Sequence, residues 1–258
     1  MVPPRFLFKY RSLSDAVARA RVERTLTHNE LYFAAPRQFN DPFESRFRLS
    51  LDGTPEQKIN KLSRLLRRSN PSLTEHAAVA DASDMLLRAP ASLQQMWEDH
   101  LVEDLRSGRR LAILSLAERP TDVLLWSHYA ESHRGVCLQF DTTACDIFRA
   151  SLKVTYADSA PTLHWFTDDE MTMFRAVTLG KGSQWRCEDE WRSIEFNRGA
   201  GVRSYSPNAL AAVIFGLETP LKDRAMVRQW CENRSRPIPF FEVRRDPGQY
   251  TLSLLPQP

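Results

Sequence analysis

Strand-forming segments lie on both sides of residues 54–108 in this 258-residue chain, and that stretch contains almost none. Alternating hydrophobic residues predict a first strand over residues 5–11, and more strands in the second half of the chain. Two capping boxes, Ser72–Glu75 and Ser92–Gln95, predict helices in the stretch between. We therefore expect one α+β domain over residues 1–258, with a central mixed or antiparallel sheet and a helical insertion at 54–108.

Composition narrows the class of protein. The chain is 42% hydrophobic and 26% charged, which is typical of a globular protein that folds without disulfides or a structural metal. Its four cysteines form neither a CxxC pair nor a Cys/His cluster with zinc-ligand spacing, so no metal is expected. No stretch approaches 18 consecutive apolar residues, and no signal-peptide core is present. We expect a cytoplasmic bacterial protein without a membrane partner.

The charge is mildly basic. The net charge is +3 with a pI of about 8.7, which is less basic than a dedicated nucleic-acid-binding domain. The chain has 29 Arg and 6 Lys. Arg is suited to binding phosphate and carboxylate groups in two-point contacts, so the bias agrees with an anionic ligand. An Arg-rich genome composition explains the same count, and both explanations remain open.

Common catalytic motifs are missing. The sequence contains no GxGxxG, P-loop, HExxH or GxSxG motif, which removes the usual support for Rossmann dehydrogenases, P-loop NTPases, zincin proteases and α/β hydrolases. Four clusters that combine aromatic and charged residues remain as candidates for a functional site.

The first cluster lies at the end of the first strand. The two-residue period of a strand places Lys9 and Arg11 on the face opposite Tyr10. Two cations at a strand end, next to a helix start, can hold a phosphate or a ribose. The alternative is a solvent-facing side of an edge strand.

The second cluster is the segment Phe39-Asn-Asp-Pro-Phe-Glu44. Asn-Asp-Pro forms a turn with its own side-chain hydrogen bonds, and in such a turn Asp41 and Glu44 converge. The alternative is a purely structural turn, held by its two phenylalanines in the core.

The third cluster is a short helix that starts near Pro120 and that we expect Gly135 to end. Trp126 and Tyr129 share one face of this helix. Such a pair serves either as part of the core or as a stacking platform for a ligand ring.

The fourth cluster follows Lys181 and contains three consecutive acids at the entry to the strand EWRSIEF. Strand alternation places Glu188 and Glu190 on the same side, together with Arg192. Two like charges raise one pKa unless cations compensate them. This arrangement suits one catalytic carboxylate with a helper.

These four clusters, in this order, resemble a bacterial family known as a domain of unknown function, number 2971. The resemblance covers most of the chain outside residues 54–108 and includes the specific matches FNDPFE and W-x-x-E-x-E-W-R. The matching stretches are LFKYRSL, ELYFAAPRQFNDPFE, VLLWSHYAESHRGVCLQFD, VTYAD and KGSQWRCEDEWR.

The order of a polar anchor on the first strand, an aromatic-rich middle and a late Glu-x-Glu strand is also similar to the ADP-ribosyltransferase superfamily. This resemblance implies an ADP-ribosyltransferase-like core and NAD as substrate. Glu190 would hold the ribose 2′-hydroxyl and stabilise the positive charge that develops as the glycosidic bond breaks. Glu188 would orient or deprotonate the acceptor. The acceptor is a protein, a nucleic acid, a small molecule or water.

The other candidate residues fall into two groups under this reading. The first would contact NAD: Lys9, Tyr10, Arg11, Trp126, Tyr129 and Lys181. Among them, Lys9 and Arg11 would bind pyrophosphate or adenosine ribose, and Tyr129 or Trp126 would stack on nicotinamide. The second would contact the acceptor substrate: Asp41, Glu44 and Arg192.

Two other functions remain open. A metal-dependent nuclease could use Lys181 with the clustered carboxylates of residues 41, 44, 188 and 190, since such clusters suit Mg²⁺-assisted phosphodiester cleavage. A non-catalytic module that binds nucleotides or nucleic acid could use the basic helices of the insertion. We also expect the first strand and the EWRSIEF strand to line one cleft, with the inserted helices at its border.

Overall fold

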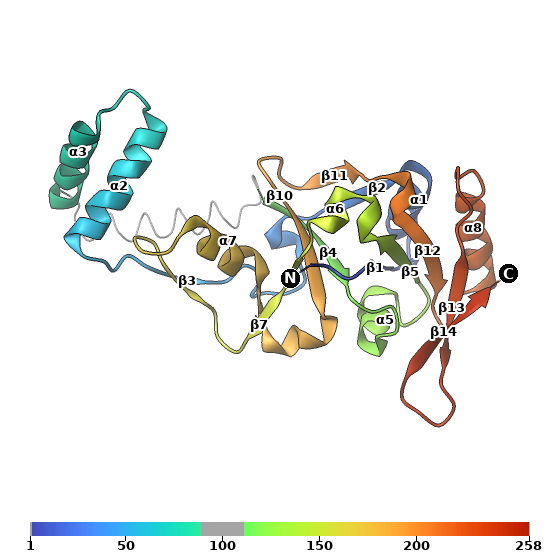
Figure 1. The fold of residues 1–258 in the computed structure, drawn as a ribbon. Helices are drawn as coiled ribbons and strands as arrows, with labels where there is room; N and C mark the ends of the chain where they lie inside the picture. The colour runs from blue at the N-terminus through green and yellow to red at the C-terminus, as the bar shows by residue number, and fades with distance from the viewer. Residues whose placement is uncertain (1, 89–110, 258) are drawn as a thin grey trace.

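The computed structural model describes residues 2–88 and 111–257, and its centre is an eight-stranded mixed sheet (Figure 1). The strand order is β14-β13-β12-β5-β1-β4-β10-β6. Strands β12 and β13 pair in parallel, and the other neighbours in this sheet are antiparallel. The strands are β1 (Phe6–Arg11), β4 (Leu111–Ala117), β5 (Val136–Asp141), β6 (Leu152–Lys153), β10 (Glu190–Phe196), β12 (Leu210–Phe215), β13 (Phe240–Arg245) and β14 (Leu252–Gln257). The expected α+β class with a mixed sheet is confirmed.

Smaller elements complete the described chain. Three two-stranded sheets pair β2 (Glu30–Phe33) with β11 (Gly201–Ser204), β3 (Arg48–Ser50) with β8 (Thr162–His164), and β7 (Thr155–Ala157) with β9 (Gly180–Gly182). The α-helices are α1 (Ala16–His28), α2 (Pro55–Ser69), α3 (Glu75–Arg88), α5 (Val123–Tyr129), α6 (Asp146–Arg149), α7 (Glu170–Leu179) and α8 (Leu221–Cys231). Short 3-10 helices are η1 (Pro36–Gln38), η2 (Thr142–Ala144), η3 (Ser183–Glu188) and η4 (Pro207–Ala209).

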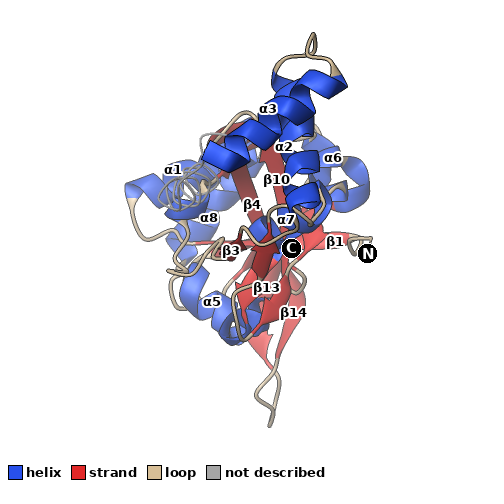
Figure 2. Ribbon diagram, turned by 90° about the vertical axis from the view of Figure 1, so that its left-hand side faces the viewer, coloured by secondary structure: helices blue, strands red, loops and turns tan. Residues whose placement is uncertain are grey.

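The core lies on both faces of the large sheet, because strand alternation sends neighbouring side chains of β1 in opposite directions. Leu7 packs on one face with Leu26 of α1. Phe8 and Tyr10 pack on the other face with Trp126 of α5. Figure 2 shows helices on both sides of the strands. This packing fixes the central strand that carries the first candidate cluster.

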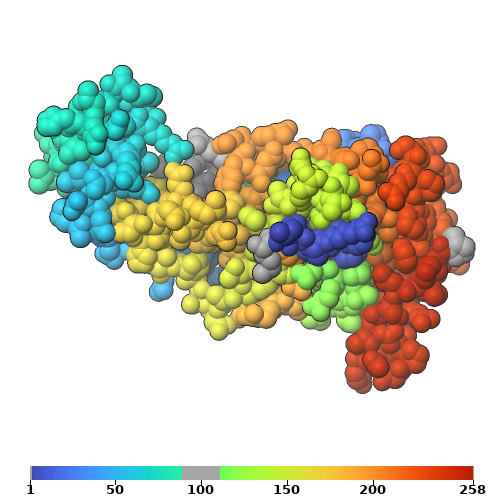
Figure 3. Space-filling view, in the orientation of Figure 1, coloured from blue at the N-terminus to red at the C-terminus, as the bar shows by residue number. Residues whose placement is uncertain are grey.

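The described part of the insertion is a helical hairpin of α2 and α3 that projects from one end of the molecule (Figures 1 and 3). Thr54 caps α2 with Pro55 in its first turn, as the sequence predicts. Lys61 of α2 lies over the ring of Trp165, and Arg68 pairs with Glu170 of α7. The capping box at 92–95 and the rest of the insertion up to 108 fall outside the described residues. The extent of the domain and of its insertion therefore stays a prediction.

Helix α5 is shorter than the sequence predicts. It ends at Tyr129, and Glu131, Ser132 and His133 then follow with φ of 52°, 50° and 69°. This left-handed turn replaces the final turn that we expected before Gly135. Backbone N–H groups of the turn still find acceptors, since Ser132 donates to the carbonyl of Ser127 and His133 to that of Trp126.

Membrane crossing finds no support in this part of the chain. Within residues 2–88 and 111–257, none of the helices has the length and hydrophobicity that a bilayer span requires.

Candidate functional site

A pocket of about 660 Å³ lies where β1 and β4 separate. The two strands pair only at Phe8 and Ala117, although β1 stays paired with β5 along its whole length. Residues 8–11 of β1, the following Ser12, and residues 113 and 115–117 of β4 line the pocket. Across the gap, Lys9 Nζ donates a hydrogen bond to the backbone carbonyl of Ser115. The split in the sheet therefore creates the pocket.

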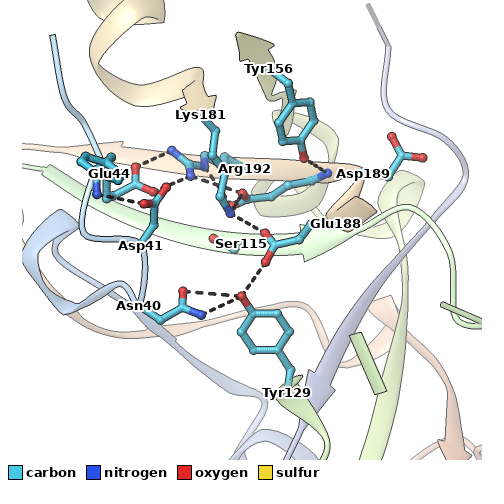
Figure 4. A network of polar contacts seen from close by, with 12 residues as sticks. Asn40, Asp41, Glu44, Ser115, Tyr129, Tyr156, Lys181, Glu188, Asp189 and Arg192 are labelled. Carbon is cyan, nitrogen blue, oxygen red and sulfur yellow. Dashed lines mark hydrogen bonds and ion pairs between the residues drawn. The ribbon is translucent and has the colours of Figure 1, made fainter. Parts of the chain in front are cut away.

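The buried end of this pocket holds the two carboxylates of the fourth cluster. Lys181 Nζ donates to Glu188 Oε2 and, at 2.8 Å, to Glu190 Oε2 (Figure 4). Tyr129 Oη donates to Glu188 Oε1 at 2.5 Å, and Asn40 Nδ2 donates to Tyr129 Oη at 3.1 Å. Burial, together with the neighbouring Glu188 carboxylate, raises the pKa of Tyr129, so that its hydroxyl stays protonated. We call these residues, except Asn40, the inner lobe.

The first strand also reaches this pocket, as expected. Lys9 and Arg11 line it together with Glu188 and Glu190. The prediction that the first strand and the EWRSIEF strand meet at one cleft is confirmed. The inserted helices were expected to border it, but the pocket-lining residues of the described chain include none from α2 or α3.

Glu188 and Glu190 lie close together, but not because they alternate along one strand as the sequence predicted. Glu188 ends η3 rather than lying on the strand, and β10 begins at Glu190. Asp189 between them has φ 47° and ψ 47°, a left-handed conformation. This turn, rather than strand alternation, brings both carboxylates to Lys181. Lys153 Nζ holds the turn by contacts with the backbone carbonyl of Asp189, at 3.2 Å, and with its side chain.

Behind the pocket, Arg192 compensates the charge of two glutamates. Its guanidinium donates to Glu190 Oε1 at 2.9 Å and to both carboxylate oxygens of Glu44 at 2.7 and 2.8 Å. A further hydrogen bond reaches the carbonyl of Thr178 at 2.6 Å. Burial alone would raise the pKa of Glu190, but the charges of Arg192 and Lys181 lower it to about 2. Glu190 is therefore ionised and already paired.

The residues assigned to the acceptor substrate lie outside the pocket. Arg192 is fully buried and Glu44 nearly so, and each is occupied by the other. Asp41 is buried as well, with one oxygen accepting from the backbone N–H of Phe43 at 2.8 Å. None of the three lines the pocket. The positions of Asp41, Glu44 and Arg192 favour a structural role, and their contact with a substrate stays a prediction.

Two of the aromatic candidates are also core residues. Trp126 is fully buried, and its Nε1 donates to the carbonyl of Pro120 at 2.8 Å. Tyr10 packs edge-on against Trp126 at 5.1 Å, and its hydroxyl donates to the carbonyl of Arg119. Both rings are buried, and Tyr10 also forms part of the pocket wall. Trp126 is therefore part of the core and its contact with NAD stays a prediction, whereas Tyr129 lines the pocket.

A group of cations also lines the pocket. Lys9, Arg11 and Arg21 line it, and none of the carboxylates in the described chain forms an ion pair with them. Burial and the charge of Arg11 lower the pKa of Lys9 to about 7, although Glu190 and Glu188 act in the opposite direction. Burial and the charge of Arg21 lower the pKa of Arg11 to about 10. An anion bound here would relieve this repulsion.

Several residues that line the pocket were not predicted from the sequence to contact a ligand: Arg21, Tyr32, Gln38, Phe39, Asn40 and Ser115. Phe39 and Asn40 belong to the second cluster, in which we predicted functional roles for the acidic residues instead. The other four come from α1, β2, η1 and β4, whose meeting is a tertiary feature that no local pattern reveals.

A metal site finds no support in the geometry. Both inner carboxylates are bound to the ammonium of Lys181, and a cation would have to displace it. Across the described ranges, no group of three or more His, Cys, Asp or Glu side chains is arranged to hold a metal ion.

Comparison with known proteins returned one result. Searches among curated proteins and among solved structures found no match. A family model matches residues 125–193, which run from α5 into β10 and include Tyr129, Lys181, Glu188 and Glu190 of the inner lobe. Over this segment the match confirms the resemblance drawn from the sequence, and the family is the one described as Protein of unknown function (DUF2971).

Proposed function

We propose that this protein consumes NAD, as an ADP-ribosyltransferase or an NAD glycohydrolase. The observation that carries the proposal is that one pocket combines the Glu188 carboxylate with cations that form no ion pair among the described residues. NAD has the matching charges, because its pyrophosphate is negative and its nicotinamide ring is positive. A volume of about 660 Å³ also falls within the usual range for small-molecule sites.

The phosphates would lie against Arg11 and Lys9. A guanidinium can bind phosphate oxygens in two-point contacts, and charge-assisted hydrogen bonds of this kind are short and strong. Arg21 stands close enough to depress the pKa of Arg11, so its charge adds to the attraction for the pyrophosphate. Bound phosphate would supply the charge compensation that these cations lack.

The nicotinamide ribose would then lie in the inner lobe. When the C1′–N bond breaks, its electron pair goes to the pyridinium nitrogen, and neutral nicotinamide leaves. Positive charge develops on the ribose at C1′ and its ring oxygen. A carboxylate fixed beside this charge stabilises the transition state without reorganisation. The acceptor, water or a nucleophile of another molecule, then bonds to C1′ and loses a proton.

We assign the two glutamates the reverse of the roles that the resemblance implied. The oxygens of Glu190 accept from Arg192 at 2.9 and 3.2 Å and from Lys181 at 2.8 Å, so its charge is already compensated. Glu188 has only Lys181 and the neutral hydroxyl of Tyr129. We therefore assign Glu188 to the developing ribosyl cation. Glu190 becomes a positioning residue that holds Lys181.

Release of nicotinamide from NAD by matched variants tests the proposal. Glu188→Gln keeps the size of the side chain and removes its charge, so we expect a loss of about 10²–10³ in rate. Glu218→Gln is the control, because that carboxylate lies at the surface, paired with Arg245. Cleavage of a nucleic acid that EDTA abolishes would favour the nuclease alternative instead. Equal nicotinamide release by both variants would overturn the role of Glu188.

A further inference from the structure

The exposed end of the pocket has its own side chains, and the catalytic proposal uses only the charge of Arg21 among them. We define the outer lobe as Arg21 of α1, Tyr32 of β2 and Gln38 of η1, all of which line the pocket. Arg21 and Gln38 are exposed and Tyr32 is half-buried, whereas the inner lobe is largely buried. Arg21 also acts on Arg11, so the outer lobe lies next to the phosphate-binding cations.

Gln38 is held in one orientation. Its Oε1 accepts from the backbone N–H of Ala35 at 2.9 Å and from Tyr32 Oη at 3.1 Å. A backbone N–H can only donate, so the oxygen must face Ala35 and the amide nitrogen must face away. Both lone pairs of the oxygen are then in use. The Nε2 group keeps two donors that have no partner among the described residues.

Arg21 and Tyr32 form a stacking pair. The guanidinium carbon lies 5.8 Å from the centre of the tyrosine ring. Flat aromatic rings and guanidinium planes are the usual platforms for nucleobases. A base between the two groups needs about 7 Å, twice the stacking rise of about 3.4 Å. An outward shift of Arg21 of about 1 Å is enough, and this side chain lies at the surface.

From these contacts we propose that the outer lobe binds the nucleobase of the dinucleotide and does not select adenine. This inference rests on the proposed function for the position of the phosphates. Gln38 offers donors only, so it reads acceptor atoms of a base, such as ring nitrogens or the 6-oxo group of hypoxanthine. A glutamine that recognises adenine by two hydrogen bonds also accepts from the adenine amino group through its amide oxygen. In Gln38 this oxygen already accepts two hydrogen bonds. Nucleotides with a 6-oxo purine therefore bind as well as adenine nucleotides.

Calorimetry with three ligands tests the outer lobe without any turnover: AMP, IMP and ribose 5-phosphate. We expect AMP and IMP to bind within about threefold of each other, and both at least about tenfold tighter than ribose 5-phosphate, because stacking adds affinity for any base. Tyr32→Leu should remove most of this base-dependent gain. Tyr32→Phe keeps the ring and should retain it, which separates stacking from a general loss of structure.

Gln38→Glu tests the donors. The carboxylate can still accept from Ala35 and from Tyr32, but it cannot donate to a base. The change in affinity for ribose 5-phosphate measures the effect of the added charge. Only a larger loss of affinity for AMP and IMP than for ribose 5-phosphate supports the inference. Equal binding of all three ligands, or a preference for AMP above tenfold, would overturn it. Base-dependent binding without nicotinamide release would refute the proposed chemistry alone.

Discussion

Glu190 and Arg192, two residues apart on β10, form an ion pair on one face of the strand, with Arg192 Nε donating to Glu190 Oε1 at 2.9 Å. Both side chains are almost entirely inaccessible to solvent. Glu44, 148 residues earlier in the chain, pairs with the same guanidinium through both carboxylate oxygens. A buried charge network of Glu190, Arg192 and Glu44 therefore joins distant segments of the chain next to the pocket.

This network predicts a large effect of Arg192→Met on stability. The substitution leaves Glu190 and Glu44 buried and short of a positive partner, which typically costs about 3–5 kcal/mol of unfolding free energy. Urea denaturation of the purified variant measures the loss. Arg198→Met is the control, because its pair with Glu195 is exposed, and such pairs contribute roughly 0–1 kcal/mol. Equal losses in the two variants would contradict the structural role of Arg192.

Glu190→Gln tests how much the ionised Glu190 carboxylate contributes to stability. The pKa of Glu190 lies near 2 in the folded protein, below its usual value, so ionised Glu190 stabilises the fold above its unfolded pKa. That contribution is lost as the pH falls toward 2. We expect the variant to be less stable than the wild type at pH 7 and more nearly equal to it below pH 3. Urea midpoints at pH 7 and pH 3 measure this, and a constant difference would count against it.

The left-handed turn at Asp189 predicts a specific pattern of tolerance. Asn also visits this conformation, so Asp189→Asn should preserve the backbone, whereas Asp189→Val should cost about 1–2 kcal/mol. Denaturation curves of the two variants provide the comparison. A β-branched side chain that is accepted without loss would show that the turn is not held in the left-handed region.

Binding of ADP-ribose should weaken as the pH rises. The pKa of Lys9 is lowered to about 7, so its positive charge is present at pH 6 and mostly lost at pH 8. The pyrophosphate of this ligand does not change its charge over the range, so a change in affinity reports on the protein. We expect up to tenfold weaker affinity at pH 8 by calorimetry. Lys9→Met should bind weakly at both values, and a variant with an unchanged pH dependence would rule Lys9 out.

The sequence predicted the elements that carry the site better than the contacts within it. Alternation in the first strand and in EWRSIEF predicted β1 and β10, and cations with acids on two strands predicted their shared cleft. The left-handed turn at Asp189 was missed because a strand pattern is continuous through that position. Trp126 was ambiguous, since helical spacing is the same for a core residue and for a ligand platform.

Long-range contacts explain the remaining differences. Nothing in the acids of the second cluster showed that Glu44 would meet Arg192 rather than a substrate. Arg21, Tyr32 and Gln38 come from three separate elements, and their proximity depends on how α1, β2 and η1 pack. Such packing is decided by the whole core, so it is not visible in any short stretch of sequence.

A crystal structure of Glu188→Gln with NAD tests the central claim most directly, because this variant should bind NAD without cleaving it. The account predicts the pyrophosphate against Arg11 and Lys9, with the nicotinamide ribose beside residue 188 and Tyr129. NAD bound in the reverse direction, bound elsewhere, or absent at saturating concentration would contradict it.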